Sequence, residues 1–390
     1  MVQEWTSKRI AIIGGGPAGC MCAKILADEG YDVTIFDKDK PLRTLLPTGG
    51  GKCNLAHAEY DFRELTKNYP RGEKFLYSIF SKFSTTDTIE FFKSIGVETY
   101  TREDNRIFPS SNSSADVRNK LLKSFRAEHI QENVSDVEKI SNGYKIKTNK
   151  SSYLFDTVVI ATGGMTKNNI PGGLDINIAE PTQSLVGLIT EKNFKELAGV
   201  SIKNVRCKNY TGDMLFTHKG ISGPLIYTIS SVMAREKFPY SLKFNLCEDL
   251  KDPQNLLNNN SHKEIKNLIG QYLPKSFSIW LLKDLQISPD LECHKINREM
   301  RERIFNSLNE FEIKVTGKIP DSEVVTCGGI DLNEINPKTL ESKKYKNLFF
   351  CGEVLDIDGM CGGFNLQNCW STGYIVSQSI RLASSFSNLP

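Results

Sequence analysis

Several features that place a chain in a special class are missing from this sequence. It contains no apolar run near the roughly 18 residues that a membrane-spanning helix needs, and residues 1–8 lack the apolar stretch of a signal peptide. Basic residues (49) barely outnumber acidic ones (46), and no run of them concentrates the net charge of +3. Binding driven by phosphate neutralisation is therefore not expected. We expect a cytoplasmic protein that binds neither a membrane nor nucleic acid.

The ten cysteines also lack the spacing that would give them a common task, because no two of them form a Cys-x-x-Cys pair. Local spacing therefore predicts neither a zinc knuckle nor a thioredoxin-type dithiol, and we expect no metal site. Without an export signal, a disulfide framework is not expected either. Most of the cysteines should pack as small buried hydrophobic residues.

What is present is the composition of a globular protein. The chain has 390 residues, of which 39% are hydrophobic and 24% charged, and its length suits two or three domains. Short strands separated by turn residues run from about 175 to 250 and indicate an antiparallel barrel or sandwich. Residues 252–310 read as mostly helical, and an α/β pattern returns after residue 324.

Local patterns predict particular elements in the α/β parts of the chain. A helix is predicted over 116–129, with Ser114 or Asp116 as its N-terminal cap. Alternation at 144–147 and 153–155 predicts a small antiparallel ribbon. A last helix is expected from about residue 369 to 383.

The first forty residues carry the most specific pattern. A buried strand at 9–13 leads into Gly14-x-Gly16-x-x-Gly19, a helix ends at Gly30, and a second strand ends at Asp37. In such a βαβ unit the glycines permit the tight turn, the close approach of backbone to a pyrophosphate and the packing of helix on strand. The helix N-terminus attracts phosphates, and the acid can accept hydrogen bonds from a ribose. We therefore predict a dinucleotide site.

The far end of the chain indicates which dinucleotide binds. A buried strand at 156–161 leads into Thr162-Gly163-Gly164, and a late strand at 347–351 leads into Gly352-Glu353. In the flavoprotein variant of the fold, a distant C-terminal strand returns to the first sheet, and its acid binds ribityl hydroxyls that NAD does not possess. Residues 362–367 then open a helix whose N-terminus can stabilise negative charge on a reduced flavin. FAD is the better interpretation.

The chain resembles one particular family, the BaiN/YhiN-like NAD(P)/FAD-dependent oxidoreductases, whose members include FAD-binding enzymes of the aminoacetone oxidase family. The resemblance runs nearly from end to end. Six blocks carry it: 49–54 (Gly-Gly-Gly-Lys-Cys-Asn), 106–109 (Arg-Ile-Phe-Pro), 215–224 (Leu-Phe-Thr-His-Lys-Gly-Ile-Ser-Gly-Pro), 325–330 (Val-Thr-Cys-Gly-Gly-Ile), 352–359 (Gly-Glu-Val-Leu-Asp-Ile-Asp-Gly) and 362–367 (Gly-Gly-Phe-Asn-Leu-Gln).

The resemblance implies an α/β fold with a Rossmann-like FAD-binding domain of the glutathione reductase kind, an inserted β-barrel-like domain and a small helical subdomain. The FAD domain would comprise residues 1–174 and 320–390, the barrel 175–251 and 311–319, and the helices 252–310. The residues that we expect to contact FAD are Gly14, Gly16, Pro17, Ala18, Gly19, Asp37, Lys38, Gly51, Lys52, Cys53, Asn54, Val134, Ala161, Thr162, Gly163, Gly352, Glu353, Gly363, Phe364, Asn365 and Leu366.

One segment departs from the family pattern. After Gly164 the family usually carries a glycine-rich stretch and a helix, and residues 165–180 are too short for that helix. Either the flavin site is more open here, or another segment covers it.

Three residues are candidates for catalysis. His218 suits proton transfer beside the flavin, or it caps the turn at 220–223. Lys52 can stabilise a phosphate or the N1–C2 edge of the flavin, or it is a solvated loop lysine. Cys53 ends the glycine-rich loop, and the family arrangement brings it towards Cys361, so the two can form a redox pair or pack as ordinary small residues. Asp356 and Asp358 are expected to form turns.

The leading hypothesis is an FAD-dependent oxidoreductase acting on a small organic substrate held between the FAD domain and the inserted domain. The family points to oxidation of an amine such as aminoacetone, or to reduction of an activated double bond. The single Gly-x-Gly-x-x-Gly unit leaves no dedicated nicotinamide domain, so NAD(P)H would dock transiently over the flavin, and dioxygen is the other possible second substrate. The alternative is an FAD-bearing RNA-modification or redox-interaction protein. The sequence does not define the oligomeric state.

Overall fold

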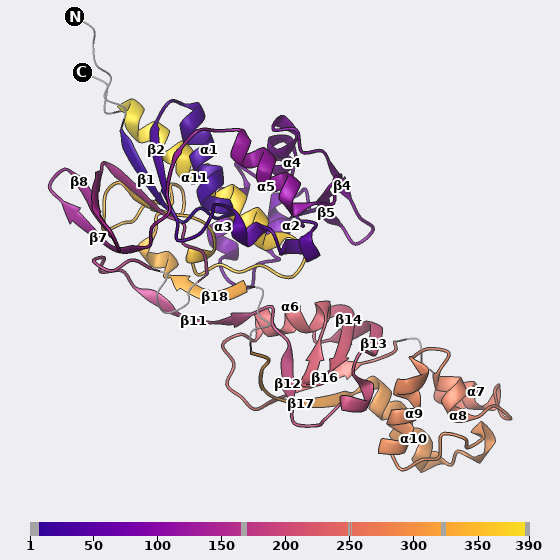
Figure 1. The fold of residues 1–390 in the computed structure, drawn as a ribbon. Helices are drawn as coiled ribbons and strands as arrows, with labels where there is room; N and C mark the ends of the chain where they lie inside the picture. Colours follow the sequence, from indigo (N-terminus) through magenta and orange to yellow (C-terminus); the bar gives the residue numbers. More distant parts are fainter. Residues whose placement is uncertain (1–7, 165–169, 249, 251, 321–324, 387–390) are drawn as a thin grey trace, which may run out of the picture. The chain divides into compact units, whose positions relative to one another are not determined.

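The structure is a computed structural model that describes residues 8–164, 170–248, 250, 252–320 and 325–386. The chain forms two compact units, one from Met1–Thr182 with Val325–Pro390 and the other from Gln183–Val324 (Figure 1). These boundaries differ from the expected ones at three places, one of which is the return to the first unit at Val325 instead of residue 320. Residues 175–182 belong to the first unit, because strand β11 (Ile178–Ser184) pairs with β18 (Val325–Ile330). The barrel and the helices after it share one unit.

A five-stranded parallel sheet forms the centre of the first unit. Its strand order is β19-β10-β1-β2-β6, with β1 at Arg9–Ile13, β2 at Asp32–Phe36, β6 at Glu128–Ile130, β10 at Thr157–Ile160 and β19 at Leu348–Phe350. The inner strands are almost continuously apolar and buried, as expected for a parallel sheet covered on both faces. The Rossmann-like α/β fold predicted from the sequence is confirmed.

Helices α1 (Pro17–Asp28) and α11 (Phe364–Phe386) pack against each other beside this sheet (Figure 1). The final helix begins at Phe364, earlier than the expected start near Cys369. The other helices of this unit are α2 (Phe62–Thr66), α3 (Glu73–Phe80), α4 (Thr85–Ser94) and α5 (Ser114–Lys123), and its single-turn 3-10 helices are η1 (Arg43–Leu45), η2 (Thr48–Gly51), η5 (Leu332–Glu334) and η6 (Gly352–Val354).

The expected helix over 116–129 is wrong in its second half. Helix α5 ends at Lys123, and residues 128–130 instead form the edge strand β6, which pairs in parallel with β2. The side chain of Thr34 on β2 donates a hydrogen bond to the Glu128 carboxylate at 3.2 Å. Pairing with a strand more than ninety residues away overrides the local helical pattern.

Small sheets complete the first unit. Strands β7 (Val134–Ile140), β8 (Gly143–Thr148) and β9 (Ser152–Phe155) form an antiparallel sheet, so the ribbon predicted at 144–147 and 153–155 is confirmed and gains a third strand. Strands β3 (Ala56–His57), β4 (Thr99–Thr101) and β5 (Arg106–Pro109) form another.

The second unit is a closed six-stranded barrel with helices, which settles the choice between barrel and sandwich. The strand order is β12-β15-β14-β13-β16-β17, with bounds Leu188–Thr190, Gly220–Ser222, Tyr210–Thr217, Ser201–Cys207, Tyr240–Asn245 and Phe311–Lys318. The helices are α6 (Pro224–Val232), α7 (Pro253–Asn258), α8 (Ile265–Ile269), α9 (Lys275–Asp284) and α10 (Arg298–Asn309), with η3 (Lys195–Leu197) and η4 (Cys293–Lys295). Barrel and helices share one hydrophobic core, in which Phe277 of α9 stacks on Phe216 of β14 with ring centroids 5.7 Å apart.

Among the described residues, no helix has the length and apolar character needed to cross a membrane.

Candidate functional site

Four of the predicted FAD-binding segments follow neighbouring parallel strands. Gly14 follows β1, Asp37 follows β2, Ala161 follows β10, and Gly352 comes just after β19. Because the carboxyl ends of parallel strands meet at one edge of a sheet, the fold gathers these segments there. The sequence alone placed them at four distant points of the chain.

The turn from β1 to α1 distinguishes glycines needed by the fold from a glycine that leaves room for a ligand. A Cβ on Gly14, where φ is +109°, would lie 2.2 Å from the Ala161 carbonyl oxygen. A Cβ on Gly19 would lie 2.0 Å from the Gly14 carbonyl oxygen. A Cβ on Gly16 would meet nothing closer than the Thr44 hydroxyl at 3.9 Å. The space over Gly16 is therefore open, as a pyrophosphate requires.

The N-terminus of α1 is prepared for an anion. Its N-cap is Gly16, which supplies no side-chain hydrogen bond, and its first turn contains no acidic residue. Pro17 at the first helical position has no N–H to satisfy. The remaining free N–H groups and the positive end of the helix dipole can bind phosphate oxygens.

Asp37 stands beside this turn. Its carboxylate accepts hydrogen bonds from the backbone N–H of Gly15 at 2.6 Å and of Asp39 at 2.8 Å. These bonds fix the orientation of the carboxylate and leave lone pairs for ribose hydroxyls. The neighbouring Lys38 side chain is exposed.

Glu353 in η6 is held close to the segment after β10. Its Oε1 accepts a hydrogen bond from the Thr326 backbone N–H at 2.8 Å, and a Cβ on Gly164 would lie 2.8 Å from the same oxygen. Burial raises the pKa of Glu353 to about 7, and the charge of Asp358 acts in the same direction, whereas the hydrogen bond from Thr326 lowers the pKa. The carboxyl group therefore titrates near neutral pH.

The glycine-rich loop at 48–54 lies against the start of α11. A Cβ on Gly363, where φ is +103°, would lie 2.4 Å from the Ala56 carbonyl oxygen and 2.9 Å from Oδ1 of Asn54. Trp370 fixes the same contact, because its ring N–H donates to the Leu55 carbonyl oxygen at 3.0 Å. The fold thus brings together two predicted FAD-contacting segments that are separated by about three hundred residues.

Buried oxygen atoms without partners mark the same places. In the described part of the chain, four buried side-chain oxygens accept no hydrogen bond: those of Asn54, Thr162, Gln367 and Asn368. An unsatisfied buried polar atom costs free energy unless a ligand or water completes it. Asn54 and Thr162 are predicted FAD contacts. The open space at Gly16, the uncapped helix and these oxygens all fit FAD.

Apart from Val134, the other predicted contacts lie in these segments. Ala18 is buried in α1, and a Cβ on Gly352 would lie 2.7 Å from its Cβ. A Cβ on Gly51 or Gly163 would meet nothing within 4 Å. Val134 is the first residue of β7. Phe364 is buried at the start of α11, where Leu366 is half-buried and the Asn365 amide bonds to both backbone groups of Gly359.

The three catalytic candidates lie in different environments. Lys52 is exposed in the glycine-rich loop, and His218 is exposed in the second unit, in the turn between β14 and β15. Cys53 is fully buried, and burial raises the pKa of its thiol to about 12, although a hydrogen bond with Thr48 opposes this. Burial and the raised pKa both oppose formation of a reactive thiolate at this position.

Cys361, the other half of the possible redox pair, is half-buried and lies next to Arg106. The guanidinium Nη2 of Arg106 is 3.8 Å from its sulfur. Burial raises the pKa of this thiol, whereas the charge of Arg106 lowers it. In this structure no disulfide joins Cys53 and Cys361.

Sequence reasoning missed several residues of this region. The His57 imidazole lies 3.0 Å from the Gly362 carbonyl oxygen and stacks on Phe364, with ring centroids 4.5 Å apart. Burial lowers the pKa of His57, which favours the neutral ring. Gln367 and Asn368 directly follow predicted contacts, so extending the motif by two positions would have included them.

The expected role of Asp358 as a turn former is wrong. Its side chain is completely buried and forms a two-point ion pair with Arg71, whose side chain is 14% exposed. A buried carboxylate requires such a partner, and Arg71 lies far away in the sequence.

The fold and the site define an FAD-dependent oxidoreductase. The chain belongs to the HI0933-like family, whose profile, described as the HI0933-like protein Rossmann domain, matches residues 8–379. The resemblance to BaiN/YhiN-like enzymes is thereby confirmed, and the cofactor is FAD.

Several proteins resemble the chain over almost its whole length. It is 28% identical over 401 residues to "Ribosomal RNA dihydrouridine synthase" of Escherichia coli, covering 96% of this chain and 98% of that protein. It is 26% identical over 408 residues to "3-dehydro-bile acid delta(4,6)-reductase" of Clostridium scindens, covering 95% and 98%. Among solved structures, 3-ketosteroid delta1-dehydrogenase from Sterolibacterium denitrificans has a TM-score of 0.48 and 12% identity, covering 97% of this chain and 100% of that one.

Proposed function

We propose that this enzyme reduces an activated carbon–carbon double bond, with NAD(P)H as the electron donor. The observation that carries the proposal is the site at the start of α11, where the Asn54 and Gln367 oxygens lack partners and the Cys361 sulfur lies 3.8 Å from Nη2 of Arg106. The names of the relatives support reduction over amine oxidation. Making dihydrouridine and reducing a delta(4,6) bile acid both add hydrogen across a double bond conjugated to a carbonyl.

Such a reduction needs a hydride and a proton. When bound, reduced FAD supplies the hydride, and the protein must supply the proton. Cys361 is the better donor of the candidates near the flavin-side loop, because burial keeps its thiol protonated while part of the residue stays accessible. Cys53 is fully buried and cannot reach a substrate. Arg106, beside the Cys361 sulfur, can stabilise the thiolate left after proton transfer until solvent reprotonates it.

The experiment is anaerobic mixing of photoreduced enzyme with a panel of conjugated enones. We expect flavin absorbance to return with an activated double bond and to stay bleached with the saturated analogue. The oxidised enzyme is mixed in parallel with NADH, NADPH and aminoacetone. Bleaching by the amine, together with no reaction of the reduced enzyme with any unsaturated substrate, would replace reduction with amine oxidation.

A second candidate substrate is a uridine in ribosomal RNA. The relatives from Escherichia coli and Haemophilus influenzae, at 28% and 29% identity, both bear the name of a ribosomal RNA dihydrouridine synthase. The near-neutral net charge of +3 favours a small molecule. Incubating reduced enzyme with unmodified ribosomal RNA and with free enones decides the case: dihydrouridine detected by mass spectrometry selects RNA, and enone turnover alone selects the small molecule.

The compartment that we propose is the cytoplasm. The spacing of the ten cysteines predicts no disulfide framework, which suits a reducing environment.

A further inference from the structure

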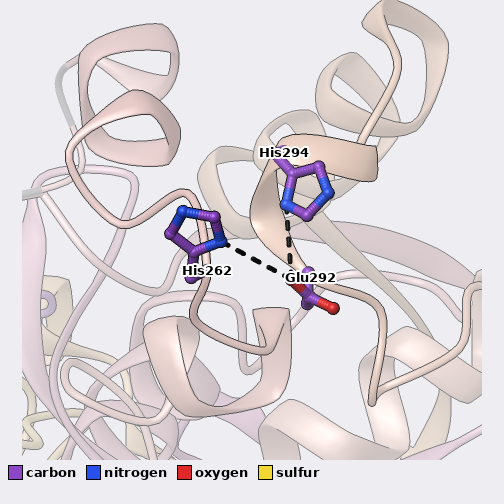
Figure 2. Close-up of side chains that lie close together, drawn as sticks. All are labelled: His262, Glu292 and His294. Carbon is purple, nitrogen blue, oxygen red and sulfur yellow. Dashed lines mark ion pairs between the residues drawn. The ribbon is translucent and has the colours of Figure 1, made fainter.

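The second unit carries a cluster of side chains that the flavin chemistry does not use. It consists of His262, Glu292 and His294, which we call the His–Glu–His cluster. Figure 2 shows both imidazole rings beside the Glu292 carboxylate. His262 lies in the segment after α7, and His294 lies in η4. The chain contains only five histidines, and two of them meet here.

The backbone beneath the cluster is fixed. Two segments run antiparallel here, joined by a bridge between Glu264 and Glu292. The N–H of Cys293 donates to the Lys263 carbonyl oxygen at 3.0 Å, and the N–H of Ile265 donates to the Leu291 carbonyl oxygen at 2.9 Å. The side chains of Cys293 and Ile265 belong to the hydrophobic core of the second unit. The positions from which the three side chains project are therefore set by the core.

The distances between the polar atoms suit a single metal ion. Nδ1 of His294 lies 3.4 Å from Oε2 of Glu292, and Nδ1 of His262 lies 3.9 Å from the same oxygen. One ligand atom from each of the three residues lies within 4.8 Å of the others. Metal–ligand bonds of about 2.1 Å in a tetrahedron place neighbouring ligand atoms about 3.4 Å apart. A small rotation of His262, whose side chain is 89% exposed, closes the remaining distance.

An ion pair fixes one oxygen of the Glu292 carboxylate. Nζ of Lys295 binds Oε1 at 3.0 Å. Lys295 leaves Oε2 free to face the rings. Nδ1 of His294 donates to the Ser261 carbonyl oxygen at 3.0 Å, so metal binding at this atom breaks that hydrogen bond and leaves the proton of the ring on Nε2.

We propose that the His–Glu–His cluster binds one divalent transition-metal ion with the preferences of Zn²⁺, and that water fills the remaining coordination. Two imidazoles and one carboxylate favour zinc, copper or nickel, whereas calcium and magnesium require mostly oxygen ligands. The exposure of His262 leaves the outer side of the ion to water. By joining residues that precede α8 to residues that precede α10, the ion would stabilise the helical part of the second unit.

The test is isothermal titration of the full-length, FAD-loaded protein with zinc chloride. We expect one equivalent to bind, and we expect His262→Ala, His294→Ala and Glu292→Gln each to weaken binding at least about tenfold. His129→Ala is the matched control, because His129 is an exposed histidine of the first unit, and it should bind zinc like the wild type. Circular dichroism checks that each variant is folded.

Cysteines also bind zinc, so the double variant His262→Ala/His294→Ala decides the location. Zinc should raise the melting temperature of the wild type and leave that of the double variant unchanged, because an ion stabilises a fold only where it binds the folded state. Absence of binding to the wild type, or binding that persists in the folded double variant, would overturn the proposal.

Discussion

Glu353 illustrates how one side chain can combine cofactor recognition with sensitivity to pH. Burial desolvates its carboxyl group and the charge of Asp358 opposes ionisation, whereas the hydrogen bond from the Thr326 N–H stabilises the charged form. Ribityl hydroxyls of FAD would supply further hydrogen bonds to the carboxylate. A residue placed in this way should affect flavin retention more than folding.

We therefore expect Glu353→Ala to weaken FAD binding by about 1–3 kcal/mol, the usual range for a lost charge-assisted hydrogen bond. Glu353→Gln should do less harm, because it preserves one acceptor oxygen. Flavin content after extensive dialysis measures both variants. Unchanged flavin content in the alanine variant, with a native circular dichroism spectrum, removes Glu353 from the FAD site.

FAD affinity should also depend on pH through the same group. In the FAD-free protein the pKa of Glu353 is raised to about 7, whereas a ribityl hydroxyl that donates to the carboxylate favours the charged form and lowers that pKa. Binding then requires loss of a proton, so affinity should fall as pH drops below 7, by at most about tenfold per pH unit. Fluorescence titration with FAD from pH 5 to pH 8 tests this, and Glu353→Gln should flatten the dependence.

The Arg71–Asp358 ion pair should contribute to the unfolding free energy of the protein. The Asp358 carboxylate is completely buried, so Asp358→Asn leaves the Arg71 guanidinium with an uncharged partner in a largely desolvated place. We expect a loss of about 3–5 kcal/mol of unfolding free energy, the range for breaking a buried pair from one side. Urea denaturation measures it. Glu302→Gln, which breaks the exposed pair with Arg298 in α10, is the control and should change little.

Residues of the site divide into those that sequence could predict and those that it could not. Gly14, Gly16, Gly19 and Asp37 follow from a local motif whose spacing is fixed by one βαβ unit. The partner of Asp358 could not be predicted from a local motif, because Arg71 lies 287 positions away and nothing in the local pattern requires the pair.

At the scale of elements, the turn from β1 into α1 contains one glycine needed for FAD binding and another needed for folding. Gly16 has φ −76° and ψ −173°, an extended conformation that any residue adopts, and a Cβ there meets no close neighbour. We expect Gly16→Val to fold normally and to lose FAD, because the side chain enters the volume of the pyrophosphate. Flavin absorbance of the purified protein and its unfolding curve are the two measurements.

Gly14→Ala is the contrasting variant of the same turn. Its Cβ would lie 2.2 Å from the Ala161 carbonyl oxygen at a φ of +109°, so it should lower the unfolding free energy by more than about 1 kcal/mol. If Gly16→Val destabilises the FAD-free protein as much as Gly14→Ala does, the open space over Gly16 is not a ligand site.

Elements were predictable where their own residues decide the structure. The strands of the parallel sheet are apolar enough to be recognised by pattern alone. Strand β6 could not be recognised in this way, because its conformation is set by pairing with β2. The helical sequence pattern of α5 continues into the residues of β6. The same holds for the His–Glu–His cluster, whose two histidines are brought together by backbone pairing between 261–264 and 291–294.

At the scale of the whole molecule, the changes in sequence pattern along the chain predicted α/β structure at both ends and the barrel between them. Two details required the structure. Residues 175–182 still belong to the first unit, in which β11 pairs with β18, and the helices of 253–309 share a core with the barrel. The short segment at 165–180 was expected to leave the flavin site more open or to be replaced by another covering segment. Its residues 165–169 lie outside the described residues.

The number of electrons that the whole enzyme accepts tests whether it contains a dithiol. FAD alone takes up two electrons, and FAD with a disulfide takes up about four. The structure favours two, because Cys53 is fully buried with a thiol pKa of about 12, and Cys361 is a free thiol beside Arg106. Anaerobic titration with dithionite, followed by flavin absorbance, measures the number directly.

The variant Cys361→Ser then distinguishes the two roles left for that cysteine. If Cys361 supplies the proton, the variant should still accept two electrons and be reduced normally by NAD(P)H, but its reaction with an unsaturated substrate should slow by about a hundredfold, the lower end of the contribution of general acid catalysis. Cys53→Ser should react like the wild type, because its side chain reaches no substrate. Uptake of four electrons by the wild type, falling to two in both variants, would instead establish the redox pair and remove Cys361 as a simple proton donor.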